Sequence, residues 1–269
     1  MLSCPHCGHG LSERAAVLAC EGGHSFDIAR QGYVNLLAHK APSQGDSAEM
    51  IAARDAVLSA GHFQPLADML AETSSDLVAG HPSGGVLDLG AGTGHYAAAV
   101  LDALPDRAGL CLDLSVYAAR RAARAHTRAG AAVCDVWARL PVRESAGALA
   151  LSVFAPRNGP ELARVLGPDG SALVAVPSER HLQELVEPLD LVGVDMHKRE
   201  RVEAAMLPLY GDAETKLEYQ LSLGAGDLEL LVAMGPSSRH VDPADVRARL
   251  ADFGPTPVTI SVELLTFRH

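Results

Sequence analysis

Short apolar runs alternate with helix-like segments through the middle of the chain, from Val86 to about Pro188. Four of these runs have the length and composition of buried strands: Val86–Leu89, Gly109–Asp113, Ala131–Cys134 and Ala148–Phe154. Strands that alternate with helices form a parallel sheet, because each crossover helix returns the chain to the same edge. We therefore expect an α/β fold with a doubly wound, mostly parallel sheet.

The C-terminal part has a different pattern. Lys216–Leu223 and Thr256–Phe267 alternate apolar and polar residues or run β-branched, and Leu228–Met234 lies between them. This arrangement predicts two final strands around a helix. Together with the central strands, they would complete a seven-stranded sheet.

Upstream of the sheet, the segment from Asp46 to Leu77 has a helical pattern. Ser43-Gln44-Gly45 reads as its start signal and Pro65 as an interruption. The 269 residues have room for one full α/β domain and a small additional unit. We divide the chain into an N-terminal head (1–37), a helical linker (38–77) and the α/β domain (78–269).

The first apolar run passes directly into a glycine-rich turn, Asp88-Leu89-Gly90-Ala91-Gly92-Thr93-Gly94, and a helical pattern begins at His95. Such a strand–turn–helix unit brings backbone N–H groups against a small charged ligand. A dinucleotide fingerprint counted from Gly90 fails at His95, and one counted from Gly92 starts three residues beyond the strand. The tighter spacing of the three glycines, with Asp88 two residues ahead, resembles motif I of the S-adenosylmethionine (SAM) methyltransferases. A nicotinamide cofactor or a purely structural turn are the alternatives.

Two more acids follow the next strands. Asp113 ends its strand where a carboxylate can accept hydrogen bonds from ribose hydroxyls. Asp135 could meet the adenine amino group, with Val136 on the ring, or could be a solvated loop acid. The SAM methyltransferases share a seven-stranded Rossmann-like sheet, in agreement with the strand pattern. The expected cofactor-binding residues are Asp88, Gly90, Ala91, Gly92, Gly94, His95, Tyr96, Asp113, Leu114, Asp135 and Val136.

The head carries two pairs of metal-ligand residues, Cys4 with Cys7 and Cys20 with His24. Their spacing matches tetrahedral zinc ligation, and three cysteines with one histidine cannot form two disulfides. A site closed by four protein ligands indicates a structural ion, which would supply much of the folding free energy of so small a unit. We expect the remaining cysteines, Cys111 and Cys134, to be core residues.

The net charge of −11 is unfavourable for binding nucleic acid, but the charge is unevenly distributed. Seven arginines and only two acids lie between Arg107 and Arg143. Arg120, Arg124 and Arg128 are spaced four residues apart, which predicts one stripe on a helix, either a binding surface or a solvated face. No segment is apolar enough to span a membrane and no secretion signal precedes the head, so we expect a cytoplasmic protein with no membrane partner.

The ordered motifs of the head, of the segment that follows it and of the catalytic domain resemble those of the 23S ribosomal RNA guanine-N1 methyltransferases. They are the four metal ligands, Gly32-Tyr33-Val34-Asn35-Leu36-Leu37, Gly45-Asp46-Ser47-Ala48-Glu49-Met50 with Arg54, Gly61-His62-Phe63-x-Pro65-Leu66, Phe154-Ala155-Pro156 and Pro177-x-x-Arg180-His181-Leu182. The resemblance covers residues 1 to 190 well and the remainder loosely. It implies a zinc head that recognises RNA and a SAM domain that methylates N1 of one guanine in a hairpin loop of domain II of 23S rRNA. The Arg-rich, Lys-poor composition is similar to that of the branch that protects producers of tylosin- or mycinamicin-type macrolides.

The methyl acceptor should lie beside the loop after the Ala148–Phe154 strand, where no carboxylate stands to act as a base. We take His181, Asn158 and Arg157 as the candidate catalytic residues: His181 or Asn158 in proton transfer, and Arg157 as a clamp for phosphate or guanine O6. A water-mediated proton transfer, and simple exposure of these loop residues to solvent, stay open. Aromatic residues of the head and linker, Phe26, Tyr33 and Phe63, could stack on unpaired bases or pack the small core.

Two rival interpretations stay open. The first is a SAM-dependent methyltransferase of a small molecule whose zinc head serves to form a homodimer, which the acidic net charge favours. The second is an RNA-binding adaptor that has lost its cofactor. The intact Asp88, the three glycines and Asp113 argue against the adaptor.

Overall fold

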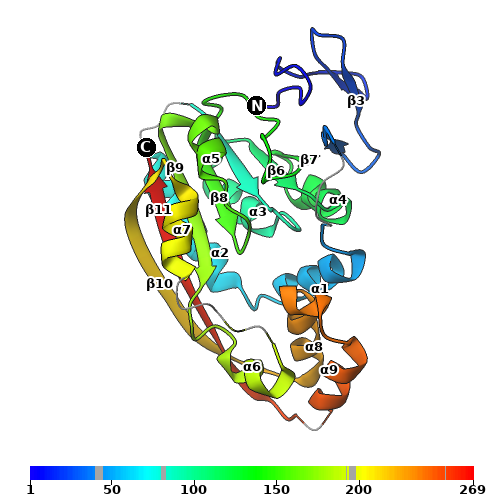
Figure 1. The fold of residues 1–269 in the computed structure, drawn as a ribbon, viewed down its shortest axis with the longest axis vertical. Coiled ribbons are helices and arrows are strands. Elements are labelled where there is room, and N and C mark those ends of the chain that lie inside the picture. Colours follow the sequence, from blue (N-terminus) through cyan, green and yellow to red (C-terminus); the bar gives the residue numbers. More distant parts are fainter. Residues whose placement is uncertain (40–44, 80–82, 192, 194–197, 252) are drawn as a thin grey trace.

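An eight-stranded sheet runs through the centre of the molecule, with helices packed on both faces (Figure 1). The computed structural model describes residues 1–39, 45–79, 83–191, 193, 198–251 and 253–269. The strand order is β10-β11-β9-β8-β5-β6-β7-β4. The strands are β4 (Tyr33–Asn35), β5 (Gly85–Leu89), β6 (Gly109–Asp113), β7 (Ala129–Val133), β8 (Gly147–Val153), β9 (Leu166–Pro177), β10 (Tyr210–Leu223) and β11 (Thr256–Arg268).

The sheet is parallel from β4 to β9 and becomes antiparallel at β11 and β10. This confirms the predicted doubly wound, mostly parallel α/β fold and its two final strands around a helix. The eighth strand, β4, was not expected as part of this sheet. It comes from the segment assigned to the head, and its residues pair with Ala131–Val133 of β7.

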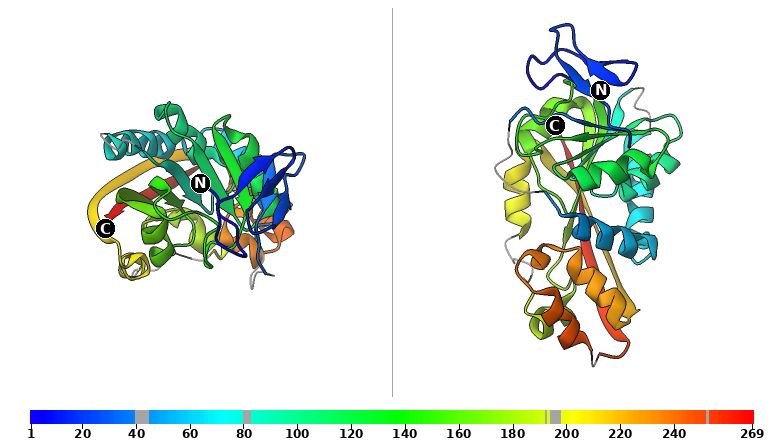
Figure 2. Two further views of the ribbon diagram at one scale, coloured as in Figure 1. Left: turned by 90° about the horizontal axis from the view of Figure 1, so that it is seen from above. Right: turned by 90° about the vertical axis from the view of Figure 1, so that its right-hand side faces the viewer.

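Helices cover both faces of the sheet, and a further group of helices lies at one end of the molecule (Figures 1 and 2). The helices are α1 (Ala48–Ser59), α2 (Gln64–Val78), α3 (His95–Ala103), α4 (Val116–Ala125), α5 (Gly159–Val165), α6 (Gln183–Leu189), α7 (Lys198–Met206), α8 (Ala225–Ala233), α9 (Pro243–Leu250) and the 3₁₀ turn η1 (Pro236–Arg239). Alternate residues of a strand serve opposite faces. In β6, Leu110 and Leu112 belong to the hydrophobic cluster that contains Leu162 of α5, whereas Cys111 belongs to the cluster that contains Ala122 of α4.

The helical linker forms as two helices. α1 begins at the N-cap Ser47, whose hydroxyl accepts the backbone N–H of Met50. The predicted interruption at Pro65 coincides with the break between the two helices, because α1 ends at Ser59 and α2 begins at Gln64. Pro65 lies in the first turn of α2, where no backbone donor is required. Ser43 and Gln44 of the expected start signal lie outside the described residues, and the observed cap is Ser47.

The head is a three-stranded antiparallel sheet of β1 (Ser12–Arg14), β2 (Val17–Ala19) and β3 (Ser25–Asp27). It lies at one end of the molecule, and α6, α8, α9 and the tips of β10 and β11 form a lobe at the other end (Figure 2). Residues at or just after the carboxyl ends of β5, β6 and β8 share a cavity with residues of α1 and η1. None of the described helices has the length and apolar character needed to cross a membrane.

Candidate cofactor, acceptor and metal sites

The glycine-rich turn after β5 folds as a strand–turn–helix unit. Gly90 has φ +69°, and a Cβ there would lie 2.6 Å from Cβ of Ala155. Gly94 has φ +79° and is the N-cap of α3, where a Cβ would lie 2.9 Å from the backbone of Ala122 in α4. Both positions therefore require glycine for conformation and for space.

A cavity of about 360 Å³ opens at this turn, within the usual size range of small-molecule sites. All the residues predicted to bind the cofactor line it, with the exception of Gly94: Asp88, Gly90, Ala91, Gly92, His95, Tyr96, Asp113, Leu114, Asp135 and Val136. Gly94 instead holds α3 close to α4. The residues predicted from the motif and from the strand ends therefore form the wall of the cavity that β5, β6 and β7 contribute.

Asp88 is the most strongly perturbed carboxyl of this cavity. Its side chain is buried, 2% exposed, and Oδ2 has no hydrogen-bond partner among the described residues. Burial, and secondarily the charge of Asp113, raise the pKa of Asp88 to about 7. A buried carboxylate oxygen without a donor is costly, and a ligand that brings an ammonium or hydroxyl group would relieve that cost.

Asp113 is fixed by the backbone. Its Oδ2 accepts the N–H of Gly92 at 2.9 Å and its Oδ1 accepts the N–H of Ser115 at 2.8 Å. Each carboxylate oxygen has a further lone pair with which to accept a ligand hydroxyl. Asp135 accepts the N–H of Trp137 at 2.9 Å, which folds the loop after β7 against the same cavity.

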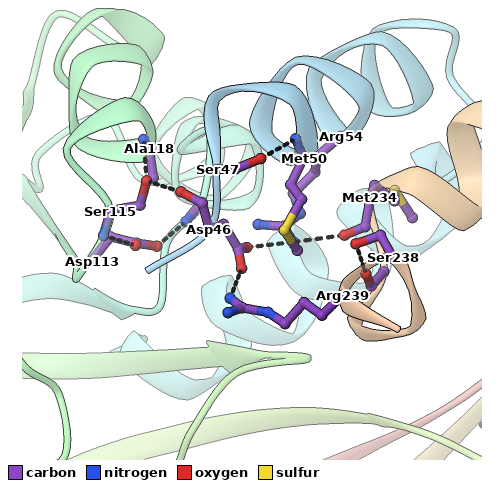
Figure 3. A network of polar contacts seen from close by, with 12 residues as sticks. Asp46, Ser47, Met50, Arg54, Asp113, Ser115, Ala118, Met234, Ser238 and Arg239 are labelled. Atoms are coloured by element: carbon purple, nitrogen blue, oxygen red, sulfur yellow. Dashed lines mark hydrogen bonds and ion pairs between the residues drawn. The ribbon is translucent and has the colours of Figure 1, made fainter. Parts of the chain in front are cut away.

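The opposite wall of the cavity was not predicted. It consists of a polar network that joins the linker to the C-terminal lobe (Figure 3). The Asp46 carboxylate binds Arg54 at 2.8 Å and Arg239 of η1 at 2.9 Å, and Arg54 also donates to the carbonyl of Met234. The Asp46 carbonyl accepts the hydroxyl of Ser115 at 2.7 Å. Asp46 and Arg54 belong to a motif that the sequence offered, but no local signal pointed to Arg239.

A second cavity, of about 630 Å³, adjoins the first beyond the end of β8. Both cavities are lined by Arg54, Phe63, Trp137, Phe154, Ala155, Pro156, Met234 and Pro236. The second cavity is mainly apolar, and its charged lining residues, within the described part of the chain, are the arginines Arg54, Arg157 and Arg201. It fits a flat, largely uncharged group that carries hydrogen-bond acceptors.

The side chain of Asn158 has a structural role. It is the N-cap of α5, with Oδ1 accepting the N–H of Glu161. Its Nδ2 donates to the carbonyls of Val136, Trp137 and Ala138 at 3.1 to 3.2 Å. Asn158 therefore fixes the loop after β7 and does not line either cavity.

His181 does line the second cavity, and its ring packs against Phe154 with 5.7 Å between the centroids. The backbone N–H of Ser261 donates to its Nδ1 at 3.2 Å. A neutral imidazole that accepts at Nδ1 carries its proton on Nε2. In this arrangement His181 is a donor at Nε2 and has no free nitrogen with which to take a proton.

Arg157 brings positive charge to the second cavity. Its Nε is buried without an acceptor among the described residues, while one terminal nitrogen donates to the carbonyl of Ala155. Burial, and then the charge of Arg201, lower the pKa of the Arg157 guanidinium. Two neighbouring cations in a partly buried place suit an anionic or strongly polarised oxygen of a ligand.

The four predicted metal ligands of the head come together: the donor atoms of Cys4, Cys7, Cys20 and His24 all lie within 4.8 Å of one another. The two cysteine sulfurs Cys7 Sγ and Cys20 Sγ are 3.6 Å apart, and Nδ1 of His24 is 3.5 Å from Sγ of both Cys4 and Cys20. Tetrahedral zinc would set S···S and S···N separations of about 3.8 and 3.6 Å. The donor set and its spacing thus fit one zinc ion. Cys111 and Cys134 are buried in the core, as expected.

The predicted arginine stripe is wrong in one member. α4 ends at Ala125, and the guanidinium of Arg128 turns inward to donate to the carbonyls of Leu101, Leu104 and Arg107. Arg120, Arg121 and Arg124 instead line a groove of about 660 Å³ that Gln31 of the head also borders. Arg121 pairs with Asp55 of α1.

Comparisons with known proteins agree with this architecture. The family model of the RlmA N-terminal zinc ribbon matches residues 2–42. A Micromonospora griseorubida protein whose name places it among the 23S rRNA (guanine-N(1)-)-methyltransferases is 48% identical over 99% of this chain and 97% of its own. The Streptomyces fradiae 23S rRNA (guanine(748)-N(1))-methyltransferase is 46% identical over 99% of this chain and 96% of its own.

Among solved structures, the YcgJ protein of Bacillus subtilis superposes with a TM-score of 0.51 at 15% identity, over 75% of this chain and 99% of that one. This likeness supports the fold alone. The near full-length identity to the two actinobacterial proteins carries the assignment: the chain belongs to the 23S rRNA (guanine-N1)-methyltransferase family.

Proposed function

We propose that this protein transfers the methyl group of SAM to N1 of one guanine in a hairpin loop of domain II of 23S rRNA. The observation that carries the proposal is the junction of two cavities at the end of β8: a polar one built on motif I, and an apolar one with donors at its edge. The guanine at position 748, named for the Streptomyces fradiae relative, is the expected target.

The cofactor cavity supplies a partner for each part of SAM. Asp88 would accept the ammonium group of the methionine moiety, and Asp113 the ribose hydroxyls. Asp135 and Val136 would face the adenine, and Arg54, whose Nη1 would lie 3.3 Å from a Cβ at Gly92, is placed beside the turn to meet the ligand carboxylate. Bound SAM supplies an electrophilic methyl group on sulfur.

Placement of the guanine would be the main catalytic contribution of the protein, since holding reactants in line supplies on the order of 7–11 kcal/mol. As N1 loses its proton, negative charge develops on guanine O6. Arg157 is placed to stabilise that oxygen, and Nε2–H of His181 to donate to the same edge of the base. We assign proton removal to solvent, because His181 already accepts a hydrogen bond at Nδ1.

The zinc-bound head and α4 would together bind the RNA outside the catalytic cavity. We propose one structural zinc on Cys4, Cys7, Cys20 and His24, and the groove of Arg120, Arg121 and Arg124 as a phosphate-binding surface. The groove lies among α1, α3 and α4 and is bordered by Gln31 of the head, so an RNA hairpin bound there would also reach the edge of the head. The local positive charge of this groove allows RNA binding despite the acidic net charge of the chain.

The physiological role we propose is resistance to tylosin- or mycinamicin-type macrolides. Its support is the near full-length identity to the Micromonospora and Streptomyces proteins. Expression of the wild-type gene in a sensitive actinobacterium should raise the inhibitory concentration of tylosin, and the Asp88→Asn variant should not. Equal sensitivity with both genes would leave a housekeeping role.

The enzymatic proposal is tested by incubating the protein with labelled SAM and unmodified 23S rRNA and mapping reverse-transcriptase arrests. N1 methylation blocks Watson–Crick pairing, so we expect one new arrest at a loop guanine of domain II. An arrest at a neighbouring guanine would keep the chemistry and change the target. SAM binding with no label on rRNA would favour a small-molecule substrate.

A further inference from the structure

Trp137 is the single tryptophan of the chain, and its side chain is 60% exposed. It lines the cofactor cavity and the acceptor cavity at the same time. Phe154, which is 41% exposed, is likewise shared by both cavities. Tryptophan is enriched at binding interfaces, and both rings lie at the place where a methyl group must pass from one cavity to the other.

The loop that carries Trp137 is held rigidly. Its backbone N–H donates to Asp135, and its carbonyl and those of its two neighbours accept from Asn158. No ring contact involves the indole within the described part of the chain. The backbone is thus fixed while the ring faces remain available, which is the arrangement of a preformed stacking platform.

The backbone of Phe154 is also held in a fixed conformation. It has φ +52°, in the left-handed region that a bulky residue rarely adopts, and its N–H is anchored on the carbonyl of Ala175. Its ring meets Phe63 edge to face at 6.3 Å and lies near His181. Backbone strain of this kind persists where the surroundings hold a side chain in a required place.

The polar groups nearby favour guanine among the bases. Arg157 and, at Nε2, His181 are donors, and guanine presents two acceptors, O6 and N7, on one edge. Adenine presents an amino group in place of O6, and this amino group cannot form a hydrogen bond with Arg157 or His181 because all of them are donors. An aromatic platform with donors at one side therefore suits a guanine whose face lies on the ring.

We propose that Trp137 stacks on the face of the guanine that receives the methyl group, after that base leaves the RNA loop, and so positions N1 at the junction of the two cavities. This inference rests on the proposed function, because it requires an RNA guanine as the acceptor. Trp137 acts here as a substrate-positioning residue. Because stacking on an aromatic ring does not distinguish one base from another, the choice of guanine comes from the neighbouring donors.

The test compares Trp137→Ala, Trp137→Phe and Tyr210→Ala with the wild type on a domain II transcript of 23S rRNA. Tyr210 is a matched control because it is 65% exposed and borders neither cavity. Loss of one stacked base should raise KM for the transcript about 5- to 150-fold in Trp137→Ala, and Trp137→Phe should recover most of it. Tyr210→Ala should match the wild type, and in Trp137→Ala the KM for the transcript should rise far more than the SAM dissociation constant.

Because Trp137 is the lone tryptophan, its fluorescence reports on the contact directly. A synthetic stem–loop that contains the target guanine should quench it, and the same stem–loop with an abasic site there should not. A KM within twofold of the wild type in Trp137→Ala, equal quenching by both stem–loops, or a loss of SAM affinity as large as the rise in KM would each overturn the stacking role while leaving rRNA methylation intact. Failure of the wild type to methylate the transcript would overturn the proposed function itself.

Discussion

Asp88 should make SAM binding depend on pH, and the dependence can be calculated. The raised pKa of about 7 means that half of the unliganded protein carries a protonated Asp88 at pH 7. A cationic ammonium beside the carboxylate favours its charged form, so the bound state should hold Asp88 ionised. Binding must then release a proton from the fraction of molecules that carried one.

The magnitude follows from this shift. With a pKa of about 7 in the free protein and a much lower one in the complex, binding should release about half a proton at pH 7 and about nine-tenths at pH 6. The apparent dissociation constant should rise about fivefold between pH 7 and pH 6. Both pH values lie below the ordinary α-amino pKa of about 7.7–8.0, so the ligand itself stays largely cationic.

Isothermal titration calorimetry in buffers of different ionisation enthalpy measures the released protons. Asp88→Asn is the matched control, because it keeps the shape of the side chain and removes the titrating group. Loss of a charge-assisted hydrogen bond should weaken its SAM binding by about 10- to 150-fold, and its proton release should fall to near zero. Proton release of the same size in Asp88→Asn, or none in the wild type, would refute the role given to Asp88.

The raised pKa of Asp88 also makes the stability of the unliganded protein depend on pH. A carboxyl whose pKa is higher in the folded protein than its ordinary 3.8 opposes folding once it is ionised, so the cost begins above pH 3.8 and is complete above pH 7. The unliganded Asp88→Asn protein should therefore be more stable than the wild type at pH 8, by on the order of 4 kcal/mol. Urea denaturation at pH 8 and pH 5.5 measures this, and a difference that grows at the lower pH would contradict the sign.

Three further predictions concern the other sites. Cys20→Ser should lower the zinc content from about one equivalent and weaken rRNA binding, while calorimetry still shows normal SAM affinity; unchanged metal content by atomic absorption would refute the ligand set. Arg124→Glu should raise KM for rRNA and leave kcat unchanged. It should also reduce the slope of log K for RNA binding against log salt concentration by the amount expected for about one or two phosphate contacts. An unaltered slope in filter binding would show that the groove is not part of the RNA site. His181→Asn, which can still accept the Ser261 N–H, should keep the acidic limb of the pH–rate profile; a lost inflection near pH 6 to 7 would restore His181 as the general base.

Local patterns were predictable from the sequence because they specify local structure. The motif I turn, the metal pairs and the strand periods each act over a few residues, and they appear where expected. Arg128 shows the limit of such reasoning: a four-residue spacing matters only inside a helix, and α4 ends three residues earlier. Its guanidinium instead meets carbonyls at the end of α3.

The far wall of the cofactor cavity could not be predicted, because it depends on contacts across the whole chain. Asp46 and Arg239 are separated by 193 positions and meet only once the C-terminal lobe has folded over α1. The role of Trp137 was hidden for a similar reason. Its loop gives no motif, and its position between two cavities depends on Asn158, 21 residues farther along the chain.

The most direct test of the central claim is nucleoside mass spectrometry of 23S rRNA after incubation with SAM that carries a deuterated methyl group. We predict one deuterated N1-methylguanosine per 23S rRNA with the wild type, and a much smaller amount with Asp88→Asn at the same limiting SAM concentration. Label in N2- or N7-methylguanosine, in another nucleoside, or in no RNA product at all would contradict guanine N1 methylation by this protein.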